Sequence, residues 1–368
     1  MKVVIAPDKF KGSLSAVEAC QAIEKGIKRV DPSIEVVKVP LADGGEGTLD
    51  VIESFLSPIR IEVEVIDPLS RPIKAHYLKS KNTAYIEMAQ ASGLQLLDQA
   101  DRDPRYTTTY GTGQLIKDAL DRGVSEVYLM IGGSATNDAG IGMAQALGYS
   151  LKDKSGAELM PVGDSLAKIE KIESPLGDVP WVSCQFVVLT DVQNPLFGKN
   201  GAAYVYGTQK GASQDVIRGL DEGLRALANQ INNGLHSKNG AGAAGGLGYG
   251  AMSFLNAELR SGIDVIMELT SFKDTIHGAD LIISGEGKFD SQTLAGKVIS
   301  GVSRLGNQHN IPIGILCGII EDQKSENLGF EFMNEISALA SGPEDSMRNA
   351  YDYLTTLAEN QIAEFIKS

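Results

Sequence analysis

Hydrophobic residues at the beginning of the chain follow the spacing of a strand, a helix and a second strand. An uninterrupted apolar run at residues 3–6 predicts a buried strand. Over residues 15–30 apolar side chains recur every three or four positions, which predicts an amphipathic helix, and Ser15 and Glu18 have the spacing of a capping box at its start. Residues 35–39 predict the next strand. A strand–helix–strand unit of this kind indicates a parallel sheet.

The C-terminal part of the chain repeats this alternation. Residues 279–284 and 313–317 predict buried strands, and residues 293–305 predict a helix between them. A long amphipathic helix is expected over residues 346–366. Because both ends of the chain alternate strands and helices, we expect them to build one α/β domain together.

The middle of the chain has a different pattern. Apolar and charged residues alternate over residues 59–65, which predicts a half-exposed strand. Turn-forming sequences separate it from short apolar segments at 73–78 and 84–87, as in antiparallel hairpins. We therefore expect an α/β fold with two α/β domains, one formed by residues 1–65 and 265–368, and an inserted one with mixed or antiparallel strands formed by residues 66–264.

Composition indicates a globular protein of about two domains. The chain has 368 residues, of which 43% are hydrophobic and 22% charged. Its net charge of −14 disfavours binding to nucleic acid and to anionic membranes. There is no apolar stretch long enough for a membrane span, and the N-terminal apolar run is too short for a signal peptide. Three widely spaced cysteines favour a reducing compartment, so we expect a cytoplasmic protein.

Four glycine-rich segments with acidic or amide side chains are the main chemical signal. They are ADGGEGT from Ala42, IGGSATNDAGIG from Ile131, GAGAAGGLGYG from Gly240 and ISGEGKFDSQT from Ile283. Glycine allows backbone N–H groups to approach an anion closely, and consecutive amides form anion-binding nests. These segments predict a protein that binds phosphates, although the sequence contains no P-loop pattern.

The segment IGGSATNDAGIG has the strongest context, because it lies between a predicted strand at 127–131 and a predicted helix at 141–147. Open α/β sheets bind ligands at the carboxyl ends of their strands. We expect its amides, hydroxyls and carboxylate to contact substrate or phosphate, through Gly132, Gly133, Ser134, Thr136, Asn137 and Asp138. The alternative is a polar loop whose Asn and Asp cap the helix.

The segment GAGAAG matches the dinucleotide pattern G-x-G-x-x-G, but no strand precedes it, so a Rossmann site is not expected. Gly242 and Gly245 are candidates for substrate or phosphate binding, with close helix packing as an equally good interpretation.

The segment TDVQNP also follows a predicted strand, at 186–189. Asp191 is our candidate for the catalytic carboxylate, and Asn194 is expected to orient it or a metal ion. The alternative is an Asx-turn that shapes the bend at Pro195.

Two lysines and four further carboxylates complete the candidates. Lys11 and Lys210 lie in glycine-bearing loops and are expected to neutralise charge on transferring or substrate groups, although either could be an ordinary surface lysine. Asp8 and Asp43 are candidates for substrate or phosphate contacts. Magnesium prefers carboxylate and water oxygens, and its candidate ligands are Glu286 and Asp290. Capping and turn roles remain open for these acids.

Several long segments resemble one known family. In order, they are PDKFKGSLS, LADGGEGT, MAQASGL, GGSATNDAGIGMAQALG, TDVQNPLFGKNGAAYVYGTQKGA, GAGAAGGLGYG and ISGEGKFDSQTLAGK. Together they resemble the bacterial glycerate kinases of the glyoxylate and galactarate pathways, from residue 1 to about residue 320. The chain departs from the family pattern at Lys9, Thr190 and Thr208, where the family often has Ser, Cys and Pro. None of these positions is a catalytic candidate.

The resemblance implies an ATP-dependent kinase that acts on D-glycerate with Mg²⁺. It also implies two α/β domains, of which the one split across both termini is flavodoxin-like. Members of the family phosphorylate mainly the 2-hydroxyl to give 2-phosphoglycerate, while related kinases give 3-phosphoglycerate, and the sequence does not decide between these products. The alternative is a non-catalytic binding protein or sensor for a small phosphorylated acid. Both a monomer and a homodimer are compatible with the sequence.

Overall fold

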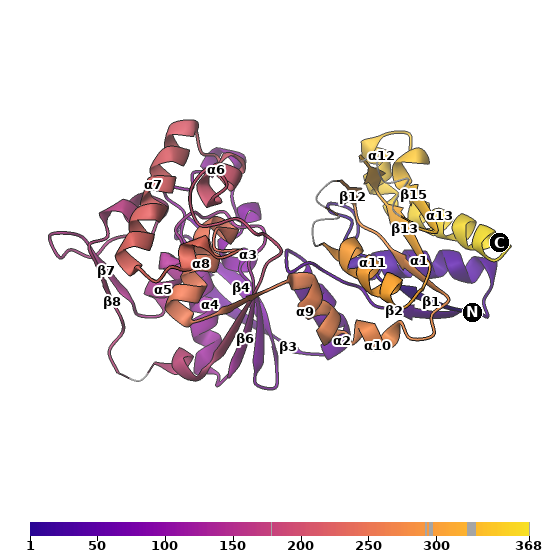
Figure 1. The fold of residues 1–368 in the computed structure, drawn as a ribbon, viewed down its shortest axis with the longest axis horizontal. Helices are drawn as coiled ribbons and strands as arrows, with labels where there is room; N and C mark the ends of the chain where they lie inside the picture. The colour runs from indigo at the N-terminus through magenta and orange to yellow at the C-terminus, as the bar shows by residue number, and fades with distance from the viewer. Residues whose placement is uncertain (178, 291–292, 294–296, 322–328, 368) are drawn as a thin grey trace. The chain divides into compact units, whose positions relative to one another are not determined.

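The computed structural model describes residues 1–177, 179–290, 293, 297–321 and 329–367. The chain forms two compact units (Figure 1). We call the first the terminal unit, which comprises Met1–Asp43, Asp50–Phe55 and Ser261–Ser368. We call the second the central unit, which comprises Gly44–Leu49 and Leu56–Arg260.

A parallel five-stranded sheet forms the middle of the terminal unit. Its strands lie in the order β15-β13-β11-β1-β2. Their bounds are β1 (Lys2–Ile5), β2 (Glu35–Lys38), β11 (Leu281–Ser284), β13 (Ile313–Cys317) and β15 (Phe332–Glu335). Counted along the chain, this is the order 2-1-3-4-5 of flavodoxin-like folds. The expected flavodoxin-like sheet built from both ends of the chain is therefore confirmed.

Helices cover both faces of this sheet. Leu281 and Ile283 belong to the same hydrophobic core as α1 (Ala16–Val30) and α13 (Ala350–Phe365). The side chain of the intervening Ile282 points the other way and contacts Gly306 of the helix α11. Because successive strand residues face opposite sides, this apolar run is buried on both sides, as its sequence predicts.

The first helix begins where the sequence places its capping box. The Ser15 hydroxyl accepts a hydrogen bond from the Glu18 amide at 3.2 Å, and the Glu18 carboxylate accepts one from the Ser15 amide at 2.8 Å. Two backbone donors at the helix start are thereby satisfied.

The helices of the terminal unit differ from expectation at two places. The helix expected over 293–305 is α11 (Val298–Gln308), and residues 294–296 lie outside the described ranges. The helix expected over 346–366 is two helices separated by Asn349, whose side-chain amide donates to Asp345 at 2.6 Å. The remaining elements are α2 (Thr48–Leu56), which contributes residues to both units, α9 (Gly262–Leu269), α10 (Phe272–Thr275), α12 (Pro343–Arg348), β12 (Lys288–Phe289) and β14 (Ile319–Ile320).

The central unit contains a mixed six-stranded sheet in the order β10-β9-β6-β5-β4-β3. Strands β3, β4 and β5 form antiparallel pairs, as the turn sequences predict, whereas β5, β6, β9 and β10 run parallel. The bounds are β3 (Ile59–Ile66), β4 (Pro72–Ser80), β5 (Thr83–Glu87), β6 (Glu126–Met130), β9 (Gln185–Leu189) and β10 (Glu258–Arg260); β7 (Ser150–Lys152) and β8 (Lys171–Glu173) form a separate hairpin.

Strand β3 bears on the position of the domain boundary. It pairs with β4 along its whole length, from Ile59 opposite Lys79 to Ile66 opposite Pro72. The expected boundary at residue 65 would detach this strand from its sheet. The division into two domains stays a proposal, and this pairing moves its first boundary toward residue 56.

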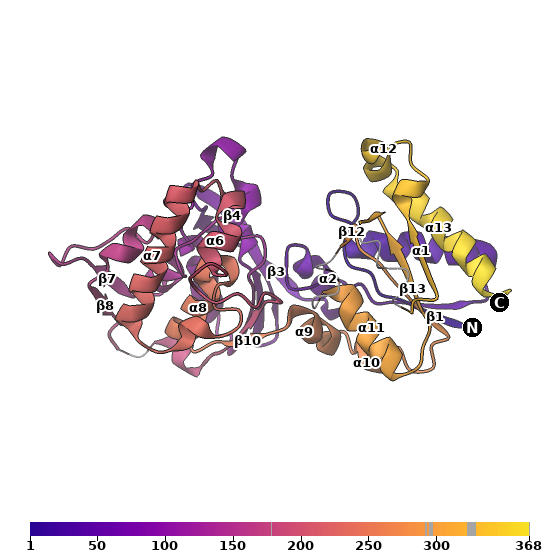
Figure 2. The same cartoon turned by 45° about the horizontal axis from the view of Figure 1, so that its top comes forward.

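Two hydrophobic cores hold together the elements of the central unit, whose ribbon is drawn in Figure 2. One joins the sheet to α4 (Tyr110–Asp121) and α8 (Ala243–Leu255). The other gathers residues of α5 (Ile141–Ala146), α6 (Ala202–Tyr206) and α7 (Gln214–Ile231), and the short α3 (Ala89–Ser92) follows β5. No helix within the described ranges has the length and apolar character that a bilayer span requires.

Candidate functional site

In the central unit the candidate loops emerge at one edge of the sheet. Met130, the last residue of β6, lies opposite Glu87 of β5 and Leu189 of β9. These three strands are parallel, so the loops that follow them start side by side. The segment 131–140 therefore emerges next to Asp191, at the sheet edge where open α/β folds bind ligands.

Lys210 is buried against this loop. Its side chain is almost inaccessible, with 2% exposure. Its Nζ donates hydrogen bonds to the Ser134 hydroxyl at 2.7 Å and to the Thr136 carbonyl at 2.6 Å. Burial lowers the pKa of Lys210 to about 7, although the charge of Asp138 acts in the opposite direction. A lysine removed from water beside a glycine-rich loop is suited to receive an anion.

Neighbouring polar atoms lack partners. Thr136 and Asn137 are fully buried. In the described part of the chain, no group hydrogen-bonds to the Thr136 Oγ1 or to either polar atom of the Asn137 side chain. Buried polar atoms are almost always hydrogen-bonded in folded proteins. A bound water or ligand group therefore has to satisfy them, which agrees with the expected roles of Ser134, Thr136 and Asn137.

Asp138, by contrast, is occupied by the protein itself. Its carboxylate accepts hydrogen bonds from the Thr109 amide and hydroxyl at 2.8 and 2.7 Å, and from the amides of Gly140 and Gly142 at 3.3 and 3.2 Å. Burial raises the pKa of Asp138. These bonds give Asp138 a structural role, in which it ties the loop to the start of α4, and its expected ligand contact stays a prediction.

The two glycines at the start of the loop have different reasons to be glycine. A methyl group on Gly132 would come within 2.7 Å of the Gly45 Cα, so the segments GGEG and IGG pack backbone to backbone. Gly133 is exposed and has a φ of +77°, a conformation that side-chain-bearing residues rarely adopt. Gly133 is thus the better candidate for a backbone contact with a ligand.

Gly242 and Gly245 are packing residues. A methyl group on Gly242 would lie 2.2 Å from the Pro195 carbonyl oxygen, and one on Gly245 would lie 2.0 Å from the Thr136 carbonyl oxygen. Gly245 also has a φ of +69°. Both α-carbons face protein backbone, which favours the packing interpretation, and their contact with substrate or phosphate stays a prediction.

Asp191 and Asn194 also have separate roles. Asp191 is half-buried just beyond β9. The Asn194 side chain accepts a hydrogen bond from the Tyr206 hydroxyl at 2.7 Å and donates one to the Asn200 carbonyl at 2.8 Å. Its amide is thus used in holding its own loop, and its expected role in orienting Asp191 or a metal ion stays a prediction.

The terminal unit gathers acids at the corresponding edge of its sheet. Asp8 follows β1, Asp43 follows β2 and Glu286 follows β11. In the flavodoxin-like order, the ligand crevice lies where the strand order reverses, beside β1 and β11. The Asp8 amide donates to the Gly285 carbonyl at 2.8 Å, which brings the two loops together. Burial and the negative charge of Asp43 raise the pKa of Asp8 to about 8.

Glu286 is the most buried of these acids, with 7% exposure. Its Oε1 has no hydrogen-bond partner among the residues that the structure describes. Burial raises the pKa of Glu286, and the charges of Asp290 and Asp43 act in the same direction. Asp290 lies 4.0 Å from the Lys288 ammonium. The region is therefore rich in negative charge that a cation would stabilise.

The carboxylate oxygens of these acidic residues are ligands of the kind that Mg²⁺ prefers. Within the described ranges, no group of three or more acidic, His or Cys side chains is close enough to hold a metal by itself. Magnesium is usually held by one or two carboxylates together with substrate phosphates, not by a cage of protein groups. The unpartnered Glu286 Oε1 suits this arrangement.

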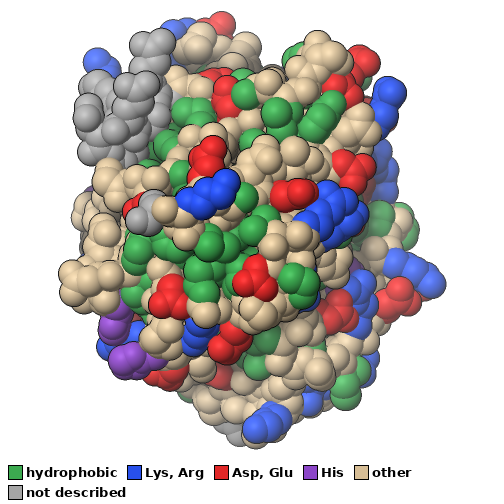
Figure 3. Space-filling view, turned by 90° about the vertical axis from the view of Figure 1, so that its right-hand side faces the viewer, with side chains coloured by type: hydrophobic (Ala, Val, Ile, Leu, Met, Phe, Trp, Pro, Cys, Tyr) green, Lys and Arg blue, Asp and Glu red, His purple; other side chains and the backbone are tan. Residues whose placement is uncertain are grey.

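The two candidate lysines lie in different units and environments. Lys11 is exposed on the loop that follows β1, whereas Lys210 is buried in the central unit. On the face of the molecule in Figure 3, acidic and basic side chains are interspersed with hydrophobic ones. Exposure alone therefore does not distinguish Lys11 from other surface lysines, while burial distinguishes Lys210.

Residues that the sequence did not single out also shape the central loop. Besides Thr109, Thr107 donates from its hydroxyl to the Ala135 carbonyl at 3.1 Å. Both threonines are fully buried. The run of three threonines before α4 was the signal in the sequence that could have indicated this role. A buried run of polar residues must find hydrogen-bond partners inside the protein.

Comparisons with known proteins identify the family. A sequence model described as the glycerate kinase family matches residues 3–367. Glycerate kinase of Bacillus subtilis is 42% identical over 375 residues, covering 100% of this chain and 98% of that protein. Glycerate 2-kinase of Escherichia coli is 41% identical over 372 residues, covering 98% and 97%.

A solved structure agrees with the sequence relatives. The crystal structure of a protein assigned as glycerate kinase 2 of Salmonella typhimurium LT2 superposes with a TM-score of 0.86 at 40% identity, covering 100% of this chain and 98% of that chain. The loops described above are thus part of a fold shared over the whole length. The chain belongs to the glycerate kinase family and is a kinase of that family.

Proposed function

We propose that this protein is a glycerate 2-kinase that transfers the γ-phosphate of ATP to the 2-hydroxyl of D-glycerate. The observation that carries the proposal is Lys210, a buried cation hydrogen-bonded to the loop after β6. Because the chain belongs to a kinase family, we expect this cation to bind an anionic group of a substrate. The choice of the 2-hydroxyl is supported by the Escherichia coli relative, which is named glycerate 2-kinase.

In the central unit, Lys210 would neutralise negative charge on a phosphoryl or carboxylate group. The hydrogen bonds to Ser134 and to the Thr136 carbonyl hold the ammonium in place, and an ammonium has a third N–H that a ligand oxygen could accept. Phosphoryl transfer depends mainly on positioning and on charge neutralisation. Thr136 and Asn137 would add hydrogen bonds from side-chain atoms that have no partner within the described ranges.

Asp191 would act as the base. Its position just beyond β9 places it beside the loop after β6. A rigidly held carboxylate there can accept the proton of the attacking hydroxyl, which is the role of the catalytic Asp in protein kinases.

In the terminal unit, Asp8, Asp43 and Glu286 would hold Mg²⁺ together with phosphate oxygens. Burial and the charge of Asp43 raise the pKa of Asp8, so a cation bound beside these carboxylates would stabilise their charged forms. When bound, the ion would supply charge neutralisation to the phosphates. The loop geometry around Asp8 and Gly285 keeps the acids at the sheet edge.

The proposal is tested by coupled ADP release with D-glycerate, L-glycerate and other small hydroxyacids, followed by phosphorus NMR of the product. We expect D-glycerate to stimulate ADP release and the product to be 2-phosphoglycerate. A 3-phosphoglycerate product would refute the proposed regiochemistry. Folded protein without glycerate-stimulated ADP release would refute the activity.

Asp191→Asn tests the base separately, because Asn preserves the local turn but cannot accept a proton. We expect kcat to fall by about 10²- to 10⁴-fold with a nearly unchanged melting temperature. If kcat is retained in this variant, another carboxylate acts as the base.

A further inference from the structure

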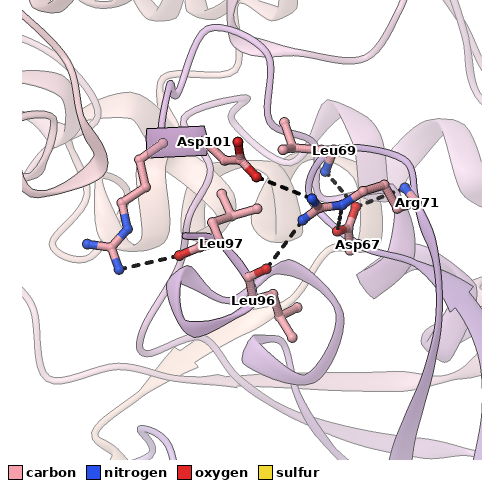
Figure 4. Close-up of polar contacts among 7 residues, drawn as sticks. Asp67, Leu69, Arg71, Leu96, Leu97 and Asp101 are labelled. Carbon is pink, nitrogen blue, oxygen red and sulfur yellow. Dashed lines mark hydrogen bonds and ion pairs between the residues drawn. The ribbon is translucent and has the colours of Figure 1, made fainter. Parts of the chain in front are cut away.

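Three arginines surround the short segment that connects α3 to α4, and two of them are neutralised by carboxylates. The Arg71 Nε donates to Asp67 at 2.6 Å, and its Nη1 donates to Asp101 at 3.3 Å (Figure 4). Arg105 forms a close pair with Asp103, at 2.6 Å from its Nη2. Both guanidinium groups therefore have internal counterions.

Arg102 has no carboxylate counterion in the described part of the chain. Among the residues that the structure describes, its guanidinium forms one hydrogen bond, from Nη2 to the Leu97 carbonyl, at the long distance of 3.5 Å. The carbonyl of Leu97 is visible beside that of Leu96, which accepts instead from Arg71 (Figure 4). The Arg102 Nε is shielded from solvent and lacks a hydrogen-bond partner among the described residues. A half-buried guanidinium with an unsatisfied donor is costly unless an acceptor is bound.

The surroundings of Arg102 connect it to the Lys210 loop. Leu94, in the same segment as Leu97, donates from its amide to the Gly133 carbonyl at 2.8 Å. The Arg102 carbonyl packs directly against Gly211, which follows Lys210 in the chain: a methyl group on Gly211 would lie 2.1 Å from that oxygen. Backbone contacts thus tie the Arg102 segment to Gly133 and to the residue after Lys210. In a protein of net charge −14, neither Arg102 nor Lys210 forms a carboxylate pair within the described ranges.

We propose that Arg102 binds an oxyanion of the substrates at the loop formed by residues 132–136. This inference rests on the proposed function, which supplies two sources of the same chemistry, the carboxylate of glycerate and the phosphates of ATP. A guanidinium is suited to both because its planar donors match a carboxylate or a phosphate with two parallel hydrogen bonds. Lys210 offers a point charge, and Arg102 adds the directional contact that distinguishes an oxyanion from a neutral oxygen.

The test compares Arg102→Met with Arg105→Met. Arg105 lies three residues away on the same segment, but its charge is already paired with Asp103, so its removal controls for local disturbance. The measurements are KM for each substrate, kcat, the dissociation constants of D-glycerate and of ATP measured separately by calorimetry, and the melting temperature.

We expect Arg102→Met to weaken binding of one substrate by about tenfold or more, while Arg105→Met leaves both unchanged. A selective rise in the glycerate KM and dissociation constant identifies the carboxylate as the ligand, and a selective rise in those of ATP identifies a phosphate. Partial restoration of Arg102→Met by added methylguanidinium would support direct binding, since a structural role gives no reason for it.

Unchanged constants for both substrates in a folded Arg102→Met protein would overturn the proposal. A lowered melting temperature in both Arg102→Met and Arg102→Gln, without a selective change in either dissociation constant, would assign Arg102 a structural role and also overturn it. Wild-type protein that binds both ligands but does not release ADP would refute the proposed function alone, because the calorimetric comparison of variants remains valid without turnover.

Discussion

The two units place opposite charges at equivalent positions of their sheets. In the central unit the loop after β6 surrounds a buried cation, Lys210. In the terminal unit the ends of β1 and β11 carry partly or fully buried acids, Asp8 and Glu286. Both arrangements lie at the carboxyl ends of parallel strands. Fold topology therefore sets where a site forms, and the side chains set which charge it accepts.

The pKa shifts in the two regions have the same physical origin. Burial lowers the pKa of Lys210 and raises the pKa of Asp8, because removal from water disfavours the charged form of each group. A ligand of opposite charge would reverse both shifts. The central loop is thus complementary to anions, and the acidic region to cations.

The largest expected effect concerns the two lysines. We expect Lys210→Met to lower kcat/KM by about 10²- to 10³-fold, the loss typical of removing one charge-stabilising group. Met fills a similar buried volume but leaves the Ser134 hydroxyl and the Thr136 carbonyl without this donor, so the melting temperature should fall while the protein stays folded. Lys11→Met, at an exposed position in the terminal unit, is the matched substitution and should have a smaller effect. Steady-state kinetics and thermal melts measure these effects. A near wild-type kcat/KM in Lys210→Met would show that this cation does not take part in the reaction.

A second pair of substitutions separates packing glycines from ligand-contacting ones. Gly245→Ala forces a methyl group to within 2.0 Å of the Thr136 carbonyl oxygen at a φ of +69°. We expect a loss of more than about 2 kcal/mol in the free energy of unfolding, since the left-handed conformation alone costs about 1–2 kcal/mol. Gly133→Ala pays only that conformational cost, because its methyl group would meet nothing closer than 3.8 Å.

Chemical denaturation measures both losses, and the KM values show which glycine affects binding. Equal losses of stability, or a raised KM only in Gly245→Ala, would contradict the assignment of Gly245 to packing.

The sequence predicted what depends on local pattern. The first strand, the capping box of Ser15 and Glu18, and the antiparallel pairing of β3 with β4 all follow from periodicity and turn residues. The long-range partners were not accessible in this way. Asn194 meets Tyr206 and Gly245 meets Thr136 only after the chain folds, so their packing roles could not be distinguished from ligand roles.

Arg102 also shows that long-range partners cannot be predicted from the sequence. The segment DRDPR contains two arginines and two aspartates, and its letters do not indicate which arginine stays unpaired. The structure pairs Arg105 with Asp103, and Asp101 with the distant Arg71. A strand pattern predicts where a loop lies, whereas the balance of charge within that loop depends on tertiary contacts.

Metal dependence tests the acidic region. Glu286→Gln removes one carboxylate charge while keeping the size of the side chain, so we expect the Mg²⁺ concentration for half-maximal activity to rise by about tenfold, the lower end for groups around a metal site. Without metal the same variant should melt at a higher temperature than wild type, because burial and neighbouring acids disfavour the Glu286 charge. Thermal melts with and without Mg²⁺ provide the second readout. An unchanged Mg²⁺ requirement together with an unchanged metal-free melting temperature would argue against a cation site here.

The last expected effect is the pH dependence that Lys210 imposes on stability. Its pKa is about 7 in the folded protein, because of burial, and about 10.4 in the unfolded chain. Between these values the unfolded chain binds a proton that the folded protein has lost, so stability rises with pH across this window. The slope is at most about 1.4 kcal/mol per pH unit.

The free energy of unfolding of wild type minus that of Lys210→Met should therefore increase from pH 7 to pH 9, measured without ligands. Other titrating groups are present in both proteins and cancel in this difference. A flat difference would mean that Lys210 keeps its proton when buried, because a folded pKa at or above the unfolded value gives no slope between pH 7 and pH 9. That result would remove the contrast with the acidic region, since burial would then not disfavour the charged form of Lys210.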